Sequence, residues 1–390
     1  MKVPFIDLKS QQERIRPQIE ARIKNVLDHG QYIMGPEIME LEERLSEFTG
    51  AKHAVTCSSG TDALLMVLMA RGVGPGDAVF TTPFTFIATA EVISLLGATP
   101  VFVDIDRKTF NIDPVKLDLA IQAIMKNDTT IYPIPNSSIS GTPHSLTPKM
   151  IIPVDLFGLP ADYDSILKIA EEHNLFVLAD AAQSFGGKCN GRRVGTLAHA
   201  TSTSFFPAKP LGCYGDGGAI FTDDIELAEI LNSIRVHGKG KDKYDNVRIG
   251  LNARMDTIQA AIILPKLEIF SEELEARQHV ADSYRKLLTN YNTPVTVPHI
   301  PEGYKSAWAQ FSVLSEIREE LQKKLHDAGI PTTIYYPKPL HLQNAFSCLG
   351  YKSGEFPIAE FTANSIFSLP MHPYLSTTHI SEIIELLKMQ

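Results

Sequence analysis

The sequence predicts an α/β domain with a mostly parallel sheet, followed by a smaller α+β domain at the C-terminus. Between residues 52 and 223, short apolar segments alternate with segments of helical pattern, the order that places helices over a parallel sheet. The apolar segments lack strict alternation of apolar and polar residues. Strands that are buried on both faces have this character.

Two helices are predicted before this domain. From Gln12 to Asp28 apolar residues recur on one helical face, and a second helix is expected from Pro36 to Phe48. The intervening segment GQYIMGP has the Gly and Pro of a turn.

Seven apolar segments are candidate strands of the sheet. They are HAVTCSS, DAVFTTP, TPVFVDI, KMIIPVDL, LFVLADA, ATSTSFF and GGAIFT. Helices are expected between them, over Asp62–Arg71, Ala88–Leu96 and Tyr163–His173. Residues 127–149, rich in Pro, Ser and Thr, are predicted to form a flexible surface insertion, with a lid or a dimer contact as the alternative.

The C-terminal part is more helical. A long helical stretch is predicted from Met255 to Thr289, interrupted by Pro265. Two strands (AWAQFSVL and TTIYYP) and two helices (Ile317–Ala328 and Thr378–Lys388) follow. We therefore expect a large domain over residues 1–264, which includes the N-terminal helices, and a small domain over residues 265–390.

The composition limits the classes of protein and partner. The 390 residues are 44% hydrophobic, enough for a large core. The net charge of −9 argues against a nucleic-acid surface, which needs clustered Lys and Arg. The four cysteines lack the spacing of a metal site. Because no signal peptide or membrane-spanning run is visible, we expect a cytoplasmic protein without metal, nucleic acid or membrane.

Two segments have the pattern of a ligand site at the ends of strands. SSGTDAL follows a strand and opens a helix, so its amide groups can bind a phosphate, although Ser and Thr at this place can also serve as caps. Asp180 ends the buried strand LFVLADA, and Gln183 follows it. An acid at this position points into the crevice where α/β proteins bind ligands, unless it caps a helix.

Lys209 has an unusual setting for a lysine. It lies between Pro207 and Pro210 in an apolar, Gly-rich segment, with no acidic residue until Asp216. A lysine in a partly apolar pocket can lose its proton and attack an aldehyde. The segment therefore predicts a nucleophilic amine that forms a Schiff base.

Four motifs in this order resemble one known family. They are SSGTDAL, ADAAQSFGG, SFFPAKPLGCYGDGGAI and IGLNARMDTIQAAI, and they are similar to those of the DegT family of nucleotide-sugar aminotransferases. These are pyridoxal 5′-phosphate (PLP) enzymes of fold type I, related to aspartate aminotransferase. The resemblance runs from FIDLKSQQ to LPMHPYL, and residues 127–149 depart from it, because the family usually has a short connection there.

The resemblance implies roles for three residues around the ring of PLP. Lys209 matches the lysine that binds the cofactor covalently. Asp180 matches the carboxylate that pairs with the pyridinium nitrogen and keeps it protonated, so that the ring accepts electrons. Gln183 matches the residue beside the 3-hydroxyl group.

Further residues match contacts at the periphery of the cofactor. Gly60, Thr61 and Ser204 match phosphate contacts, and Asn252 matches an asparagine that the neighbouring subunit provides. Phe86 matches the aromatic residue stacked on the ring. The resemblance thus implies a homodimer with shared active sites, since Asn252 requires a second subunit.

The family resemblance also implies the reaction. L-Glutamate would donate its amino group to the cofactor, and Lys209 would move the proton as a general acid and base. The amino group would then pass to the ketone of a nucleotide-linked sugar.

For the sugar, the closest resemblance is to the branch that acts at C3 of a UDP-2-acetamido-3-oxo-glucuronate, a precursor of surface polysaccharides. Arg254 suits the carboxylate of such a sugar, although it could instead form a salt bridge at a helix start. Tyr335 stands where that branch tends to have histidine, and PLHLQ also resembles 3- and 4-aminotransferases of UDP- or dTDP-linked 6-deoxy-keto-sugars. Tyr335, Tyr336 and His341 either line the sugar site or pack the small domain.

Three other functions were considered. A dehydratase of the same fold has histidine in place of the lysine, and Lys209 argues against it. A PLP-binding regulatory protein without turnover would leave the full set of Lys, Asp, Gln and Ser unexplained. A Rossmann dehydrogenase is disfavoured because no GxGxxG follows the first strand.

Overall fold

The computed structural model describes residues 3–136, 145–242 and 244–388. Within this part of the chain, seven strands form one sheet in the order β1-β9-β8-β5-β4-β2-β3, and β9 is the one strand that runs antiparallel to its neighbours. The seven strands are β1 His53–Cys57, β2 Asp77–Thr81, β3 Thr99–Phe102, β4 Thr147–Ile151, β5 Phe176–Asp180, β8 Ala200–Ser204 and β9 Gly218–Thr222. The predicted mostly parallel sheet of seven strands is confirmed.

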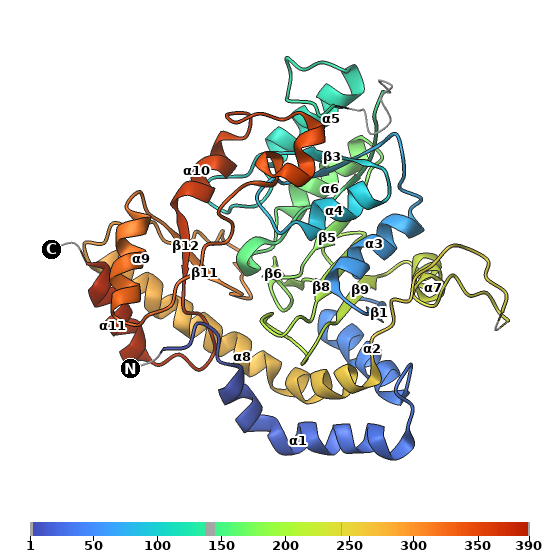
Figure 1. Ribbon diagram of the computed structural model, residues 1–390, viewed down its shortest axis with the longest axis horizontal. Helices are drawn as coiled ribbons and strands as arrows, with labels where there is room; N and C mark the ends of the chain where they lie inside the picture. Colours follow the sequence, from blue (N-terminus) through green and yellow to red (C-terminus); the bar gives the residue numbers. More distant parts are fainter. Residues whose placement is uncertain (1–2, 137–144, 243, 389–390) are drawn as a thin grey trace.

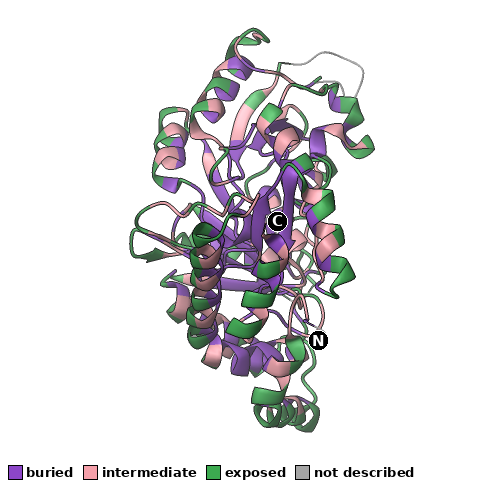
Figure 2. Ribbon diagram, turned by 90° about the vertical axis from the view of Figure 1, so that its left-hand side faces the viewer, coloured by how far each residue is buried: buried purple, intermediate pink, exposed green. Residues whose placement is uncertain are grey.

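Helices cover both faces of this sheet, which explains the apolar character of its strands. Consecutive residues point to opposite faces, so Val79 packs in one core cluster while Ala78 and Phe80 pack in another. The residues of both clusters are buried, and Figure 2 shows the strands of the sheet mostly in the colour of buried residues. The covering helices are α3 Gly60–Ala70, α4 Ala88–Leu95, α5 Pro114–Lys126, α6 Tyr163–Glu172 and α7 Ile225–Ile234.

Two further helices pack along the long helix α8, Thr257–Asn290. They are α1 Leu8–His29 and α2 Pro36–Thr49, and α1 lies beside α8 at the bottom of Figure 1. The expected interruption of α8 at Pro265 is absent, and the helix continues through it. Buried side chains follow one another along α8 on both sides of Pro265, and this packing maintains the helix although proline lacks the N–H group.

The C-terminal part contains a two-stranded antiparallel sheet of β11 and β12. Its elements are β11 Phe311–Leu314, α9 Arg318–Asp327, α10 Pro357–Ser365, β12 Ile366–Leu369 and α11 Thr377–Leu387. Short elements complete the fold: η1 Leu156–Gly158, η2 Leu340–Leu342, η3 Asn344–Leu349, and a small sheet of β6 Lys188–Cys189, β7 Arg192–Arg193 and β10 Tyr304–Lys305. The division into domains at residue 264 stays a prediction, and that position lies inside α8.

One predicted strand of the C-terminal part is wrong. The segment TTIYYP is not a strand, and it makes a single β-bridge, between Thr333 and Ser368. Pro331 and Pro337 flank the segment, and proline cannot donate to a strand ladder. The partner of β11 is β12 instead.

The structure describes the segment 127–149 in part. Of residues 127–149, the stretch 137–144 lies outside the described residues, so its predicted role stays a prediction. The described part is attached to η3, because the N–H group of Asn136 donates to the carbonyl of Leu349 at 2.8 Å. Among the described helices, none has the length and apolar character needed to cross a membrane.

Asp155 joins the ends of two central strands. It is fully buried, and its N–H group donates to the carbonyl of Asp180 at 3.0 Å. Its carboxylate accepts hydrogen bonds from the Ala161 N–H group at 2.8 Å, the Tyr163 hydroxyl at 2.7 Å and the Ser184 hydroxyl at 2.6 Å. Burial nevertheless raises the pKa of Asp155 to about 7, because it disfavours the charged form.

This raised pKa predicts a pH-dependent contribution to stability. The folded-state pKa of about 7 lies above the ordinary value of 3.8, so protonation of Asp155 stabilises the folded state. This stabilisation is complete below pH 3.8 and is lost as the pH rises through 7. Between pH 5 and pH 8, wild-type protein should lose about 2 kcal/mol of unfolding free energy relative to Asp155→Asn. Urea denaturation at both pH values measures this, with the exposed Asp327→Asn as control. An equal difference at the two pH values would contradict the prediction.

Candidate active site

Three polar segments meet at the carboxyl edge of the sheet, where β1, β5 and β8 end and β9 begins. Parallel strands bring their ends together at this edge. The approach is close: a Cβ atom on Gly60 would lie 2.7 Å from the Cβ of Ser204, and one on Gly218 would lie 2.9 Å from the Gly60 nitrogen. Glycine at both positions therefore lets the start of α3 pack against the ends of β8 and β9.

The start of α3 can bind an anion. The N–H groups of Gly60 and Thr61 lie in its first turn, where a helix provides no carbonyl partners and has its positive dipole end. Ser59 is the cap, and its side chain accepts from the Asp62 N–H group at 3.0 Å. The capping role and the anion site therefore coexist on different residues, and Ser204 is placed beside the site.

Asp180, at the end of β5, is buried with 6% of its surface exposed. Its carboxylate accepts from the Thr89 hydroxyl at 2.8 Å and from the Ala182 N–H group at 3.2 Å. Across the described residues, no basic side chain forms an ion pair with it, and burial raises its pKa. A buried carboxylate of this kind is stabilised by a cationic ligand, such as a protonated ring nitrogen.

Lys209 lies in the turn between β8 and β9, where its N–H group donates to the carbonyl of Phe206 at 2.9 Å. Its half-buried side chain is close enough to Asp180 for the two charges to interact. Burial lowers the pKa of Lys209, and the Asp180 charge opposes this change. The predicted amine and the predicted acid are thus brought together, and the amine is shifted toward its nucleophilic form.

Gln183 has a fixed amide orientation beside this pair. Its Oε1 accepts from the Phe157 N–H group at 2.6 Å, and its Nε2 donates to the Tyr336 hydroxyl at 3.1 Å. The Tyr336 ring packs edge-on against Phe84, with centroids 6.2 Å apart. Tyr336, far along the sequence, is therefore part of the same site.

Two contributors to the site were not predicted. Thr89 on α4 holds Asp180, and Phe157 orients Gln183 through its backbone N–H group. A backbone contact leaves no mark in a sequence, and nothing near Thr89 distinguishes it from other helical threonines.

Two predicted aromatic residues lie beside Tyr336. The Phe86 side chain is 56% exposed, and its ring centroid is 6.5 Å from that of Tyr336. Such a large exposed apolar ring is available to a ligand. Tyr335 packs against Tyr336 and Phe5, with ring centroids 5.9 and 6.5 Å away, so it is held next to the site.

His341 lies apart from this group, so its place in the sugar site stays a prediction, and its contacts agree with the alternative that it packs the small domain. It is 2% exposed, its Nε2 lies 3.1 Å from an oxygen of Glu360, and its ring packs on Phe356 at 4.7 Å. The reason for this burial is the short helix η2, which turns His341 inward toward α10.

Asn252 and Arg254 lie on the segment before α8. Asn252 is exposed, and its Oδ1 accepts from the Arg254 guanidinium at 2.5 Å. Between them, the Ala253 carbonyl accepts from the Ser58 N–H group at 3.0 Å. Among the described residues, no carboxylate forms a salt bridge with Arg254, so the helix-start pairing considered as its alternative is not observed.

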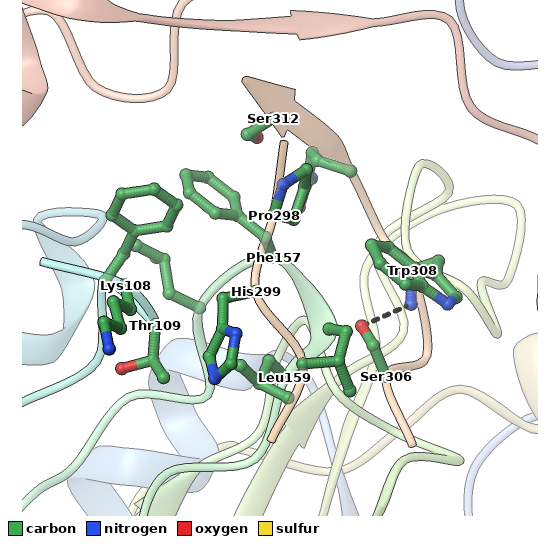
Figure 3. A pocket seen from close by; sticks show the side chains of 13 residues that line it. Lys108, Thr109, Phe157, Leu159, Pro298, His299, Ser306, Trp308 and Ser312 are labelled. Carbon is green, nitrogen blue, oxygen red and sulfur yellow. Dashed lines mark hydrogen bonds between the residues drawn. The ribbon is translucent and has the colours of Figure 1, made fainter. Parts of the chain in front are cut away.

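A separate cavity lies between η1 and the chain before β11 (Figure 3). Phe157, Leu159, His299 and Trp308 are among the side chains that surround it. Its volume of about 20 Å³ accommodates a water molecule and no larger ligand. The cavity is therefore not a sugar site.

The residues at the carboxyl edge fit PLP. The start of α3 suits its phosphate, the unpaired buried carboxylate of Asp180 suits its ring nitrogen, and the amine of Lys209 suits its aldehyde. When bound, PLP supplies a ring that holds the electrons released at a carbon beside nitrogen.

Comparisons with known proteins agree with this fit. The sequence model of the DegT/DnrJ/EryC1/StrS aminotransferase family matches residues 13–388. The UDP-2-acetamido-2-deoxy-3-oxo-D-glucuronate aminotransferase of Pseudomonas aeruginosa is 48% identical over 381 residues, 98% of each chain. The crystal structure of a DegT DnrJ EryC1 StrS aminotransferase from Brucella abortus has 49% identity, covers 98% of each chain and superposes with a TM-score of 0.92.

The cofactor follows from the family and from its solved structures. An aminotransferase of Streptococcus pneumoniae in its PLP form is 26% identical, covers 100% of this chain and 98% of its own, and has a TM-score of 0.85. The motifs, the sheet order and the fit of the site to PLP point the same way. The protein belongs to the DegT/DnrJ/EryC1/StrS aminotransferase family, and its cofactor is PLP.

Proposed function

We propose that the protein transfers an amino group from L-glutamate to the ketone of a nucleotide-linked sugar. The observation that supports this most directly is that Lys209 and Asp180 interact electrostatically at the carboxyl edge of the sheet, where α3 starts. In this proposal Lys209 binds PLP and moves the proton, while Asp180 keeps the ring nitrogen protonated. Gln183 lies at the 3-hydroxyl, and Phe86 covers the ring.

We propose C3 of a UDP-2-acetamido-3-oxo-uronate as the position that receives the amino group. The Pseudomonas relative carries the name of an enzyme for such a sugar. Arg254, which has no carboxylate partner among the described residues, offers a guanidinium for the sugar carboxylate. The product would be an amino-uronate for surface polysaccharides, made in the cytoplasm.

We further propose that two copies share their sites. Asn252 is exposed, while Gly60, Thr61 and Ser204 form the phosphate site of the same chain. A two-fold dimer would bring Asn252 of one copy to the phosphate of the other and so build two equal sites. This arrangement also explains why Arg254, beside Asn252, would reach the sugar.

The first test is catalysis itself. Protein loaded with PLP should show a visible absorbance band that borohydride removes, because borohydride reduces the bond between Lys209 and the cofactor. With glutamate and a panel of UDP- and dTDP-linked keto-sugars, it should form 2-oxoglutarate and an aminated sugar, identified by mass spectrometry. Lys209→Ala should lack the band and lose at least about 100-fold in rate.

Three results would contradict the proposal. A fully active Lys209→Ala variant would exclude the assigned amine. A cofactor-loaded protein that aminates none of the sugars would be a regulatory protein, and amination confined to 6-deoxy-sugars would exclude the uronate.

The role of Arg254 can be tested with two matched sugars. Arg254→Gln should raise KM for the UDP-3-oxo-uronate about 10–100-fold, since a charge-assisted hydrogen bond is lost. KM for the corresponding sugar without the carboxylate should change little. Arg254→Lys keeps the charge and loses the bidentate contact, so it should give an intermediate value. Equal effects on both sugars would contradict the carboxylate contact.

Subunit sharing can be tested by mixing two inactive variants. Asn252→Ala weakens the phosphate contact, and Lys209→Ala removes the nucleophile. When the two are unfolded, mixed and refolded together, a mixed dimer has one complete site if Asn252 acts across the interface. About a quarter of wild-type activity should return in a 1:1 mixture. No recovery, with mixed dimers demonstrated by native mass spectrometry, would place Asn252 in its own subunit's site.

A further inference from the structure

Helix α8 has two polar side chains directed at the loop that contains Lys209. We call residues 205–217 the lysine loop; it connects β8 to β9. Gln259 and Lys266 are seven residues apart on α8, which places them on one face of the helix. Both side chains contact the backbone of the lysine loop.

Lys266 makes the stronger contact. It is 1% exposed, and its Nζ donates to the carbonyl of Gly212 at 2.6 Å and lies 4.1 Å from the centre of the Tyr214 ring. Among the described residues, no carboxylate forms an ion pair with it. The nearby titratable groups are Cys213 on the loop and Glu273 on α8, and burial lowers the pKa of Lys266 to about 8.

Burial of such a lysine beside a helix costs free energy, because its charge is removed from water. An apolar residue of similar length would fill the same space without removing a charge from water. The compensation present is the Gly212 carbonyl and the Tyr214 ring, both on the lysine loop. The charge of Lys266 is thus used to hold this loop.

The held part of the loop is packed against the turn that contains Lys209. A Cβ atom on Gly212 would lie 2.6 Å from the Phe206 carbonyl oxygen and 2.7 Å from that of Pro207. The Phe206 carbonyl in turn accepts from the Lys209 N–H group at 2.9 Å. Gly212 therefore cannot move toward the turn without displacing the backbone before Lys209.

Gln259 holds Tyr214, two residues after Gly212. Its Oε1 accepts from the Tyr214 N–H group at 3.0 Å, and its Nε2 would lie 2.8 Å from a Cβ atom on Gly215. The base of the loop is closed by the Cys213 N–H group, which donates to the Phe205 carbonyl at 2.8 Å. Two side chains of α8 thus restrain consecutive peptide groups of the loop.

We propose that Lys266 and Gln259 are positioning residues for Lys209. They keep the lysine loop seated on α8, so that the amine of Lys209 stays at a fixed place relative to Asp180. The inference rests on the proposed role of Lys209 in binding PLP, and it adds two residues that contact neither cofactor nor sugar. Their effect is on the environment of the nitrogen that Lys209 shares with the cofactor.

The test uses full-length, PLP-loaded Lys266→Met and Gln259→Leu. The visible absorbance of the bound cofactor is titrated with pH, and the rate of cofactor loss during dialysis is measured. A loosened loop admits water, which favours the cationic form of the Lys209 nitrogen. The titration midpoint should rise by about 0.5–1 pH unit, and cofactor should be lost roughly tenfold faster.

Leu288→Ala is the matched control, because it removes buried volume at the other end of α8, away from the lysine loop. It should lower Tm by a similar amount and leave the midpoint of the absorbance titration unchanged.

Wild-type midpoints in both loop variants, or an equal shift of the midpoint in the control, would overturn the inference. If Lys266→Met does not fold, Gln259→Leu decides. Absence of the band in wild-type protein would instead overturn the proposed function and this inference with it.

Discussion

The structure of this site depends on one uncompensated charge, the carboxylate of Asp180 at the end of a buried central strand. Burial there raises its pKa, and its hydrogen bonds to Thr89 and the Ala182 N–H group provide part of the lost hydration. In the proposed function, the cationic ring nitrogen of PLP would complete the compensation. The free energy lost in burying the acid would then be offset when PLP binds, provided that the fold places an amine and a phosphate site at the matching distance.

The parallel sheet and the helices behind it meet this requirement together. The carboxyl edge gathers the start of α3, Asp180 and the lysine loop, although they are far apart in the chain. Gly60 and Gly218 allow the approach because neither has a Cβ atom. Behind the loop, α8 contributes Lys266 and Gln259. Rigid elements thus define the geometry, while the loop contributes Lys209, the proposed reactive group.

The errors of the sequence-based interpretation lie where tertiary contacts outweigh local preference. TTIYYP has the composition of a strand, yet flanking prolines and the pairing of β11 with β12 exclude it from the sheet. Pro265 should break a helix, yet α8 continues because its buried face is packed along its length.

The sequence by itself determined most of the succession of strands and helices, the family, and the residues that we propose for the chemistry, including Lys209 and Asp180. These are local signals, since periodicity and motif order are contained in short segments. The tertiary structure alone decided that Thr89 supports Asp180, that the Phe157 backbone orients Gln183, and that Lys266 holds the lysine loop. Such contacts join residues distant in sequence, and a backbone N–H group or carbonyl can serve them whatever the side chain.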